Sequence, residues 1–344
     1  GARFVTEAAF PVLGAAFVLM CLLPVCSLLA KGVLWQLEQG ERGAALHGLD
    51  LRYVLLTGAS VLPIVWFLSA GLHQVWSGGS ALVCLLDHGA SEECVETTFF
   101  FLALFCLTIL LAWPAWREHV APPTASPDVT RALNERLDQI FKGHAALNHL
   151  CGRVRATSVP DFAIGTHGLL RPCVFVGTEF AARLSDEMLA SALGHESEHV
   201  RSLDPLRYMV LRATQAVNPL GRRLLEPHVA RWYAAREAHC DREAVIRGSS
   251  PLPLAQAILQ AARPSPRELV ALGARDAVLL TFRIRMLMAF SERLPTRCCD
   301  SGPAAGPSVL LLLVLAVVLP GQIGSTALDA LHAGSEHAVH YFVR

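Results

Sequence analysis

Apolar residues gather in four stretches that carry almost no charge, at about residues 8–30, 53–76, 97–116 and 305–325. A helix needs about 20 consecutive apolar residues to cross the hydrocarbon core of a bilayer. The pattern therefore predicts four transmembrane helices, three of them within residues 1–120 and the fourth near the end of the chain. The alternative for each stretch is a buried core helix, and it weighs most for the shorter fourth stretch.

The central part of the chain alternates between apolar and polar positions with the periods of helices and short strands. Residues 121–127 have the Pro-rich composition of a linker. An amphipathic helix is predicted from Asp128 to about Leu150, followed by short extended segments between residues 153 and 176 and then by further helices. The fold class is thus a mainly α membrane protein, with an α+β domain over residues 128–300 inserted between the third and fourth transmembrane helices.

Basic residues in the loops predict an orientation. Lys31, Arg42 and Arg52 follow the first apolar stretch, whereas residues 77–96 contain no Lys or Arg. This asymmetry predicts that the 128–300 domain is cytoplasmic and that both termini, including the short tail 326–344, lie outside. The lipid bilayer is therefore an expected partner.

Composition agrees with this interpretation and excludes one class of partner. Hydrophobic residues make up 53% of the chain and charged residues 17%, which is apolar-rich for a soluble domain. The formal net charge is zero, which gives no electrostatic footprint for nucleic acid.

Of the 10 cysteines, Cys84 and Cys94 share the predicted outside loop. A disulfide between them is chemically permitted there, and two free thiols remain the alternative.

The central domain contains the sequence His195-Glu196-Ser197-Glu198-His199. The segment has helical periodicity, and Ser185 is a plausible N-cap. Residues i and i+4 share a helix face, so both imidazoles can bind one metal ion, with Glu196 beside its open position. Two neutral nitrogen ligands, one carboxylate base and a water are what a zinc peptidase requires. The alternative is a chance match, so the context has to decide.

A second helical segment, from Arg231 to Arg247, offers the missing ligand. Glu237 is a candidate third zinc ligand, and Asp241, four residues later, can accept a hydrogen bond from a ligand histidine. The alternative for Glu237 is a solvated carboxylate that pairs with Arg or Lys. Tyr233 and His228 are candidate donors to the oxyanion.

These linked motifs resemble the BlaR/MecR-like family of integral-membrane gluzincin peptidases. The resemblance rests on an Arg171-Pro172 strand, a Leu184-Ser185 helix start, the motif through Asp204-Pro205, and the Glu237-to-Asp241 element. It implies one zinc ion per chain held by His195, His199 and Glu237, Glu196 as catalytic base and Asp241 behind a ligand. It also implies a bacterial inner-membrane location. The family's penicillin-binding sensor domain has no counterpart after residue 324, so sensing of a beta-lactam is not expected.

The expected function is a membrane-embedded zinc endopeptidase acting on a protein or peptide in regulatory proteolysis. Two alternatives stay open. The first is a quality-control protease similar to HtpX, with the same chemistry. The second is a non-catalytic membrane receptor that uses the same domain for binding and signalling.

Overall fold

The computed structural model of the chain describes residues 22–39, 48–77, 113–114, 117, 122–262 and 274–293. Residues 22–39 form a helix, and the next helix is α2 (Leu49–Ser77). The predicted spans at 97–116 and 305–325, most of the span at 8–30, the Cys84–Cys94 pair and the tail 326–344 lie outside the described residues.

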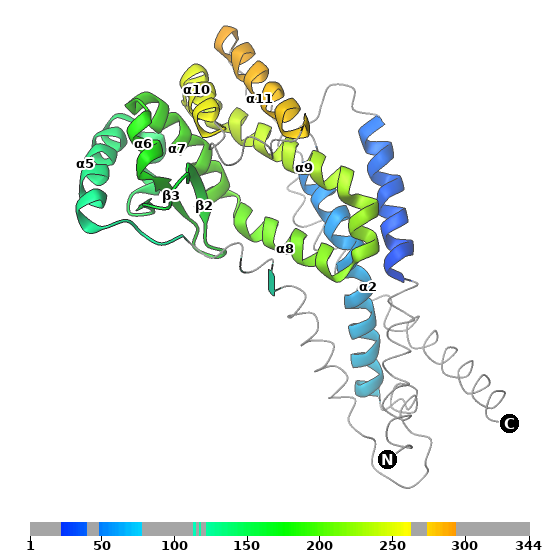
Figure 1. Cartoon of the computed structure of the whole chain (residues 1–344). Coiled ribbons are helices and arrows are strands. Elements are labelled where there is room, and N and C mark those ends of the chain that lie inside the picture. The colour runs from blue at the N-terminus through cyan, green and yellow to red at the C-terminus, as the bar shows by residue number, and fades with distance from the viewer. Residues whose placement is uncertain are drawn as a thin grey trace, which may run out of the picture.

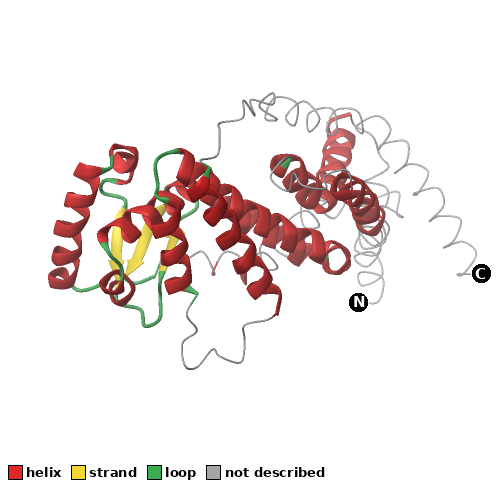
Figure 2. Cartoon of the chain, turned by 90° about the horizontal axis from the view of Figure 1, so that it is seen from above, coloured by secondary structure: helices red, strands yellow, loops and turns green. Residues whose placement is uncertain are grey.

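A small sheet and its helices form one end of the described structure (Figures 1 and 2). The chain runs through α5 (Pro127–Gly143) and the 3-10 helix η1 (Ala145–Leu150) into three strands, β1 (Val154–Thr157), β2 (Ile164–His167) and β3 (Cys173–Gly177). The strand order is β1-β3-β2, with β1 parallel and β2 antiparallel to β3. The helix predicted over 128–150 is thus two helices, separated at His144.

The remaining helices follow in sequence from the sheet. They are α6 (Thr178–Arg183), α7 (Asp186–Arg201), α8 (Asp204–Val217), α9 (Pro219–Ile246), α10 (Pro251–Ala261) and α11 (Ala274–Glu292). Ser185 caps α7 as predicted, because its hydroxyl accepts a hydrogen bond from the backbone N–H of Met188 at 3.2 Å. Leu203 then adopts a left-handed conformation (φ 52°), which separates α7 from α8.

Three hydrophobic clusters hold these elements together. One joins the sheet to α5, α6 and α7 around Leu150, Val174, Phe180 and Leu193. A second packs the helix over 22–39 and α2 against α8 and α9 around Trp232. A third joins α10 and α11 to the end of α9. Helix α9 belongs to the second and third clusters and also packs directly on α7, so it links both ends of the described structure.

The membrane prediction needs correction. Within the described ranges, no helix combines the length and the apolar character needed to cross a membrane. The predicted fold class with four transmembrane helices and the predicted multi-pass inner-membrane location are therefore wrong on this finding. The stretch predicted as a span at 53–76 belongs to α2, where Leu56 and Ala59 are buried against Trp232 and Leu211. Apolar residues of this stretch therefore pack against other helices of the protein, the alternative that a uniform apolar run does not distinguish from a span.

Candidate metal centre

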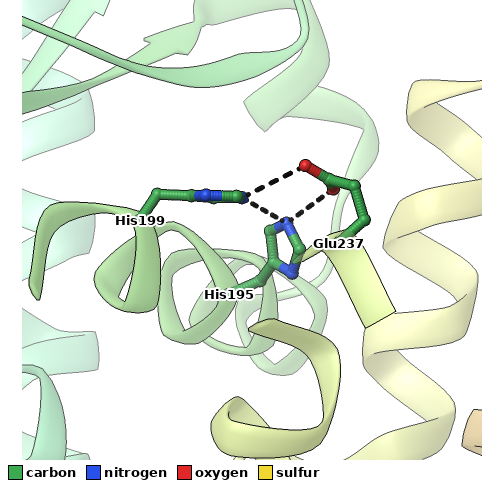
Figure 3. Close-up of side chains that lie close together, drawn as sticks. All are labelled: His195, His199 and Glu237. Carbon is green, nitrogen blue, oxygen red and sulfur yellow. Dashed lines mark hydrogen bonds and ion pairs between the residues drawn. The ribbon is translucent and has the colours of Figure 1, made fainter. Parts of the chain in front are cut away.

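Three side chains predicted as ligands meet between α7 and α9 (Figure 3). The two histidines lie one turn apart on the same face of α7, and their Nε2 atoms are 3.1 Å apart. Glu237 approaches from α9, with Oε2 at 3.4 Å from His195 Nε2 and Oε1 at 3.5 Å from His199 Nε2. The three residues form a group that can hold a metal ion.

The dimensions of this triangle suit zinc. Ligand bonds of 2.0–2.1 Å in a tetrahedral site place neighbouring ligand atoms about 3.3 Å apart. The two Nε2 atoms are 3.1 Å apart, and each has one oxygen of Glu237 near that distance, Oε2 at 3.4 Å from His195 and Oε1 at 3.5 Å from His199. Two neutral imidazoles and one carboxylate are also the donor set of a catalytic site with a fourth position left for water. The residues present therefore fit the ion.

Each of the two candidate ligand histidines lies beside a buried aspartate. His195 Nδ1 lies 2.8 Å from Asp241 Oδ1, and His199 Nδ1 lies 2.7 Å from Asp204 Oδ2. Both aspartates are fully buried. The hydrogen bond from His199 Nδ1 to Asp204 fixes a proton on that nitrogen, so a neutral His199 presents the lone pair of Nε2, which is the form a metal binds. The Asp241 carboxylate near His195 Nδ1 favours the same form of His195. Asp241 was predicted in this position, whereas the role of Asp204 had no sequence signal beyond its place after the metal helix.

Each aspartate is in turn held by an arginine. Arg236 Nε donates to Asp204 Oδ2 at 2.8 Å, and Arg283 Nε donates to Asp241 Oδ2 at 2.6 Å. The site thus contains two Arg–Asp–His arrangements, one for each candidate ligand histidine. Buried carboxylates are stable only when they are paired in this way.

Electrostatics of the metal-free site follow from these contacts. Burial lowers the pKa of His195, but Asp241 and Glu237 outweigh burial and raise it to about 10. Burial raises the pKa of Glu237, but His199, His195 and Arg283 outweigh burial and hold it well below its ordinary value. Without a cation, the site therefore holds a negatively charged carboxylate beside positively charged imidazoles, and a cation that binds there must displace protons from the imidazoles.

Glu196, the predicted base, is buried next to the sheet. Thr166 of β2 donates a hydrogen bond from Oγ1 to Glu196 Oε2 at 2.7 Å. The other acid in the motif, Glu198, is directed elsewhere, because its Oε1 lies 2.9 Å from Arg247 Nε. Sequence reasoning missed Thr166, since nothing in a four-residue strand indicates which side chain meets a helix 30 residues later.

The two predicted oxyanion donors lie in different places. His228 Nδ1 is 2.9 Å from Glu38 Oε1, and His228 precedes Glu237 by nine positions on the helix, about 13 Å along the axis. Tyr233 packs its ring on Tyr208, with centroids 5.0 Å apart. It is Tyr208, on α8, whose ring faces His199 at 6.3 Å, and its buried hydroxyl makes no hydrogen bond within the described part of the chain. Sequence reasoning missed Tyr208 also.

Cys240 lies beside the site without joining the triangle. Its Sγ is 3.7 Å from His199 Nδ1 and 3.9 Å from Asp204 Oδ2, and the three residues form a second group able to hold a cation. Because His199 Nδ1 is already bonded to Asp204, the first group is the better metal site.

Comparisons with protein-family models, with curated proteins and with solved structures found no match to this chain.

Proposed function

We propose that the protein is a zinc-dependent endopeptidase of the gluzincin kind, which hydrolyses peptide bonds in a protein or peptide substrate. The observation that carries this proposal is the convergence of His195, His199 and Glu237 with Glu196 one residue away on the same helix. A metal site alone can be structural. A buried carboxylate next to it, bonded to neither ligand nor arginine in the contacts described, has the position of a general base.

The proposed reaction divides the work among named side chains. A zinc ion, when bound, would polarise the scissile carbonyl and acidify a water molecule. Glu196, held at Oε2 by Thr166, would accept the proton of the attacking water as the water oxygen bonds to the carbonyl carbon. Glu196 then passes this proton to the leaving amine nitrogen as the C–N bond breaks. The hydroxyl of Tyr208 is the best-placed donor to the oxyanion, because it is buried, lacks another partner in the described part of the chain and lies beside His199.

The sheet supports a peptide as the substrate. Strand β2 is hydrogen-bonded on one side to β3, and within the described residues no strand pairs with its other side. Thr166 on β2 touches Glu196, so this open edge runs next to the proposed base. An extended peptide that adds to such an edge gains backbone hydrogen bonds whatever its side chains are.

The test compares new N-termini, identified by mass spectrometry, after the purified chain is incubated with casein. The intact chain loaded with zinc is expected to cleave casein. Glu196→Gln is expected to keep its zinc and lose cleavage, because only the base is removed. Glu198→Gln is the matched control, since it changes the same residue type in the same motif but on the side that faces Arg247. Cleavage by Glu196→Gln at the normal rate, or full cleavage after the zinc is removed by chelation, would refute the proposal.

A further inference from the structure

Arg283 contacts the metal group from a third helix. It lies on α11, whereas all three candidate ligands come from α7 and α9. Its Nε and Nη2 atoms donate to Asp241 Oδ2 and Oδ1 at 2.6 and 2.8 Å, and its Nη1 atom lies 3.0 Å from Glu237 Oε2. One guanidinium therefore binds two carboxylates that lie one turn apart on α9.

These two carboxylates belong to different parts of the site. Glu237 is a candidate ligand itself, and Asp241 faces the Nδ1 atom of the ligand His195 at 2.8 Å. The orientation of two of the three ligands therefore depends on one side chain. The side chain of Asp241 is fully buried and that of Arg283 is 14% exposed, so water does not compete strongly for these bonds.

We infer that Arg283 is a positioning residue that orders Glu237 and His195 for zinc, so that docking of α11 completes the metal centre. This inference rests on the proposed zinc function but not on the peptidase chemistry. The planar fork of arginine is needed, because it reaches Asp241 with two N–H groups and Glu237 with a third. The ammonium group of lysine is a point charge and cannot reproduce this geometry.

A competing effect of Arg283 has the opposite sign. Its positive charge lies next to the place where a divalent cation would bind, and like charges repel. If charge dominated, removal of Arg283 would tighten zinc binding. If ordering dominates, removal weakens binding although repulsion has been relieved. The affinity for zinc therefore distinguishes the two effects by its direction of change.

The experiment measures zinc affinity of the full chain by competition with a chromophoric chelator. The variants are Arg283→Met, which removes charge and fork, and Arg283→Lys, which keeps the charge alone. Arg285→Met is the matched control, because Arg285 is exposed on the same helix. The visible absorption of the cobalt-substituted chain is recorded for each variant, since it reports the ligand geometry without any need for turnover. Circular dichroism shows which variants are folded, and if Arg283→Met is not, Arg283→Lys decides, because it keeps a positive charge beside Asp241 and is expected to bind zinc more weakly than the intact chain.

Ordering predicts that Arg283→Met binds zinc roughly 10–100-fold more weakly than the intact chain, as is usual when a partner of a metal ligand is lost. Arg283→Lys keeps the repelling charge without the fork, so it is expected to bind zinc no more tightly than Arg283→Met and to show an altered cobalt spectrum, whereas Arg285→Met matches the intact chain. Equal affinities of folded Arg283→Met and the intact chain, or tighter binding by Arg283→Met, overturn the inference. Failure of the intact chain to bind zinc overturns both the metal centre and the inference. Failure to cleave casein with the affinity order intact overturns the peptidase proposal alone.

Discussion

At the scale of single residues, the arrangement around the histidines is set by hydrogen bonds rather than by the motif. The i, i+4 spacing brings the rings together, but the hydrogen bond to Asp204 determines which nitrogen His199 presents, and Asp241 lies 2.8 Å from Nδ1 of His195. The same holds for Glu196, whose carboxylate is oriented by Thr166 from the sheet. Small changes in these neighbours should therefore alter chemistry without changing any ligand.

Thr166→Val tests the orientation of the base. Valine has a similar shape but cannot donate, so Glu196 loses the hydrogen bond of 2.7 Å to its Oε2 atom. Loss of one hydrogen bond to a charged group is expected to lower the turnover number roughly 10-fold, with little change in KM and none in zinc content. Thr166→Ser keeps the hydroxyl and should restore the rate, as measured by casein cleavage. Equal rates for the valine and threonine forms would contradict this role.

Asp204→Asn tests the support of His199. Asparagine keeps the size but removes the charge between His199 Nδ1 and Arg236 Nε. Zinc affinity should fall by roughly 10–100-fold. The free energy of unfolding, from urea titration, should fall by about 3–5 kcal/mol because the buried guanidinium loses its partner. Asp186→Asn is the control, since the side chain of Asp186 is 65% exposed and should matter little.

At the scale of elements, β2 must stand close to α7 for Thr166 to reach Glu196. The approach depends on Gly177, where β3 ends and α6 begins. Its N–H donates to Ala163 O at 2.7 Å, and a Cβ atom here would lie 1.8 Å from Phe162 O. Glycine is therefore required to let the segment that enters β2 pack against β3.

Gly177→Ala tests this close approach. A methyl group at 1.8 Å from a backbone oxygen forces the segment before β2 to move. The free energy of unfolding is expected to fall by about 1–3 kcal/mol, the usual cost of overpacking, when measured by urea denaturation. Gly143→Ala is the matched control, because a Cβ there meets nothing within 4 Å. A neutral effect at position 177 would show that the strand entry is not tightly constrained.

At the scale of the whole molecule, the metal-free site should couple folding to pH. Burial lowers the pKa of His195, but Asp241 and Glu237 raise it to about 10 in the folded state, against an ordinary value of 6.5. A pKa that is higher in the folded state stabilises the fold fully below pH 6.5, and this contribution is lost as the pH rises to about 10. His199 is shifted in the same direction.

The urea midpoint of the metal-free chain should therefore fall as the pH rises from 6.5 to 10. If the chain binds zinc as proposed, the ion would keep the imidazoles deprotonated, and the midpoint of the zinc-loaded chain should change less across this window. His195→Gln/His199→Gln should likewise flatten the dependence. A midpoint of the metal-free chain that rises with pH would contradict the assignment of the raised pKa values.

The sequence by itself determined the local features whose cause is local. The capping of α7 by Ser185 and the helical spacing of His195 and His199 follow from side chains within one or two turns of each other. Glu237 and Asp241 could be named because ligand chemistry and i, i+4 spacing limit the choices on a second helix.

Only the tertiary structure decided what depends on distant segments. Thr166, Tyr208 and Arg283 reach the site from a strand and two helices whose approach no local pattern encodes. The same reason explains the error over α2: an apolar run specifies burial, but the partner that buries it is a tertiary property, and here the described part packs against α8 and α9. The hydrophobic pattern of the sequence predicts which residues are buried, whereas only the tertiary structure shows which residues they pack against.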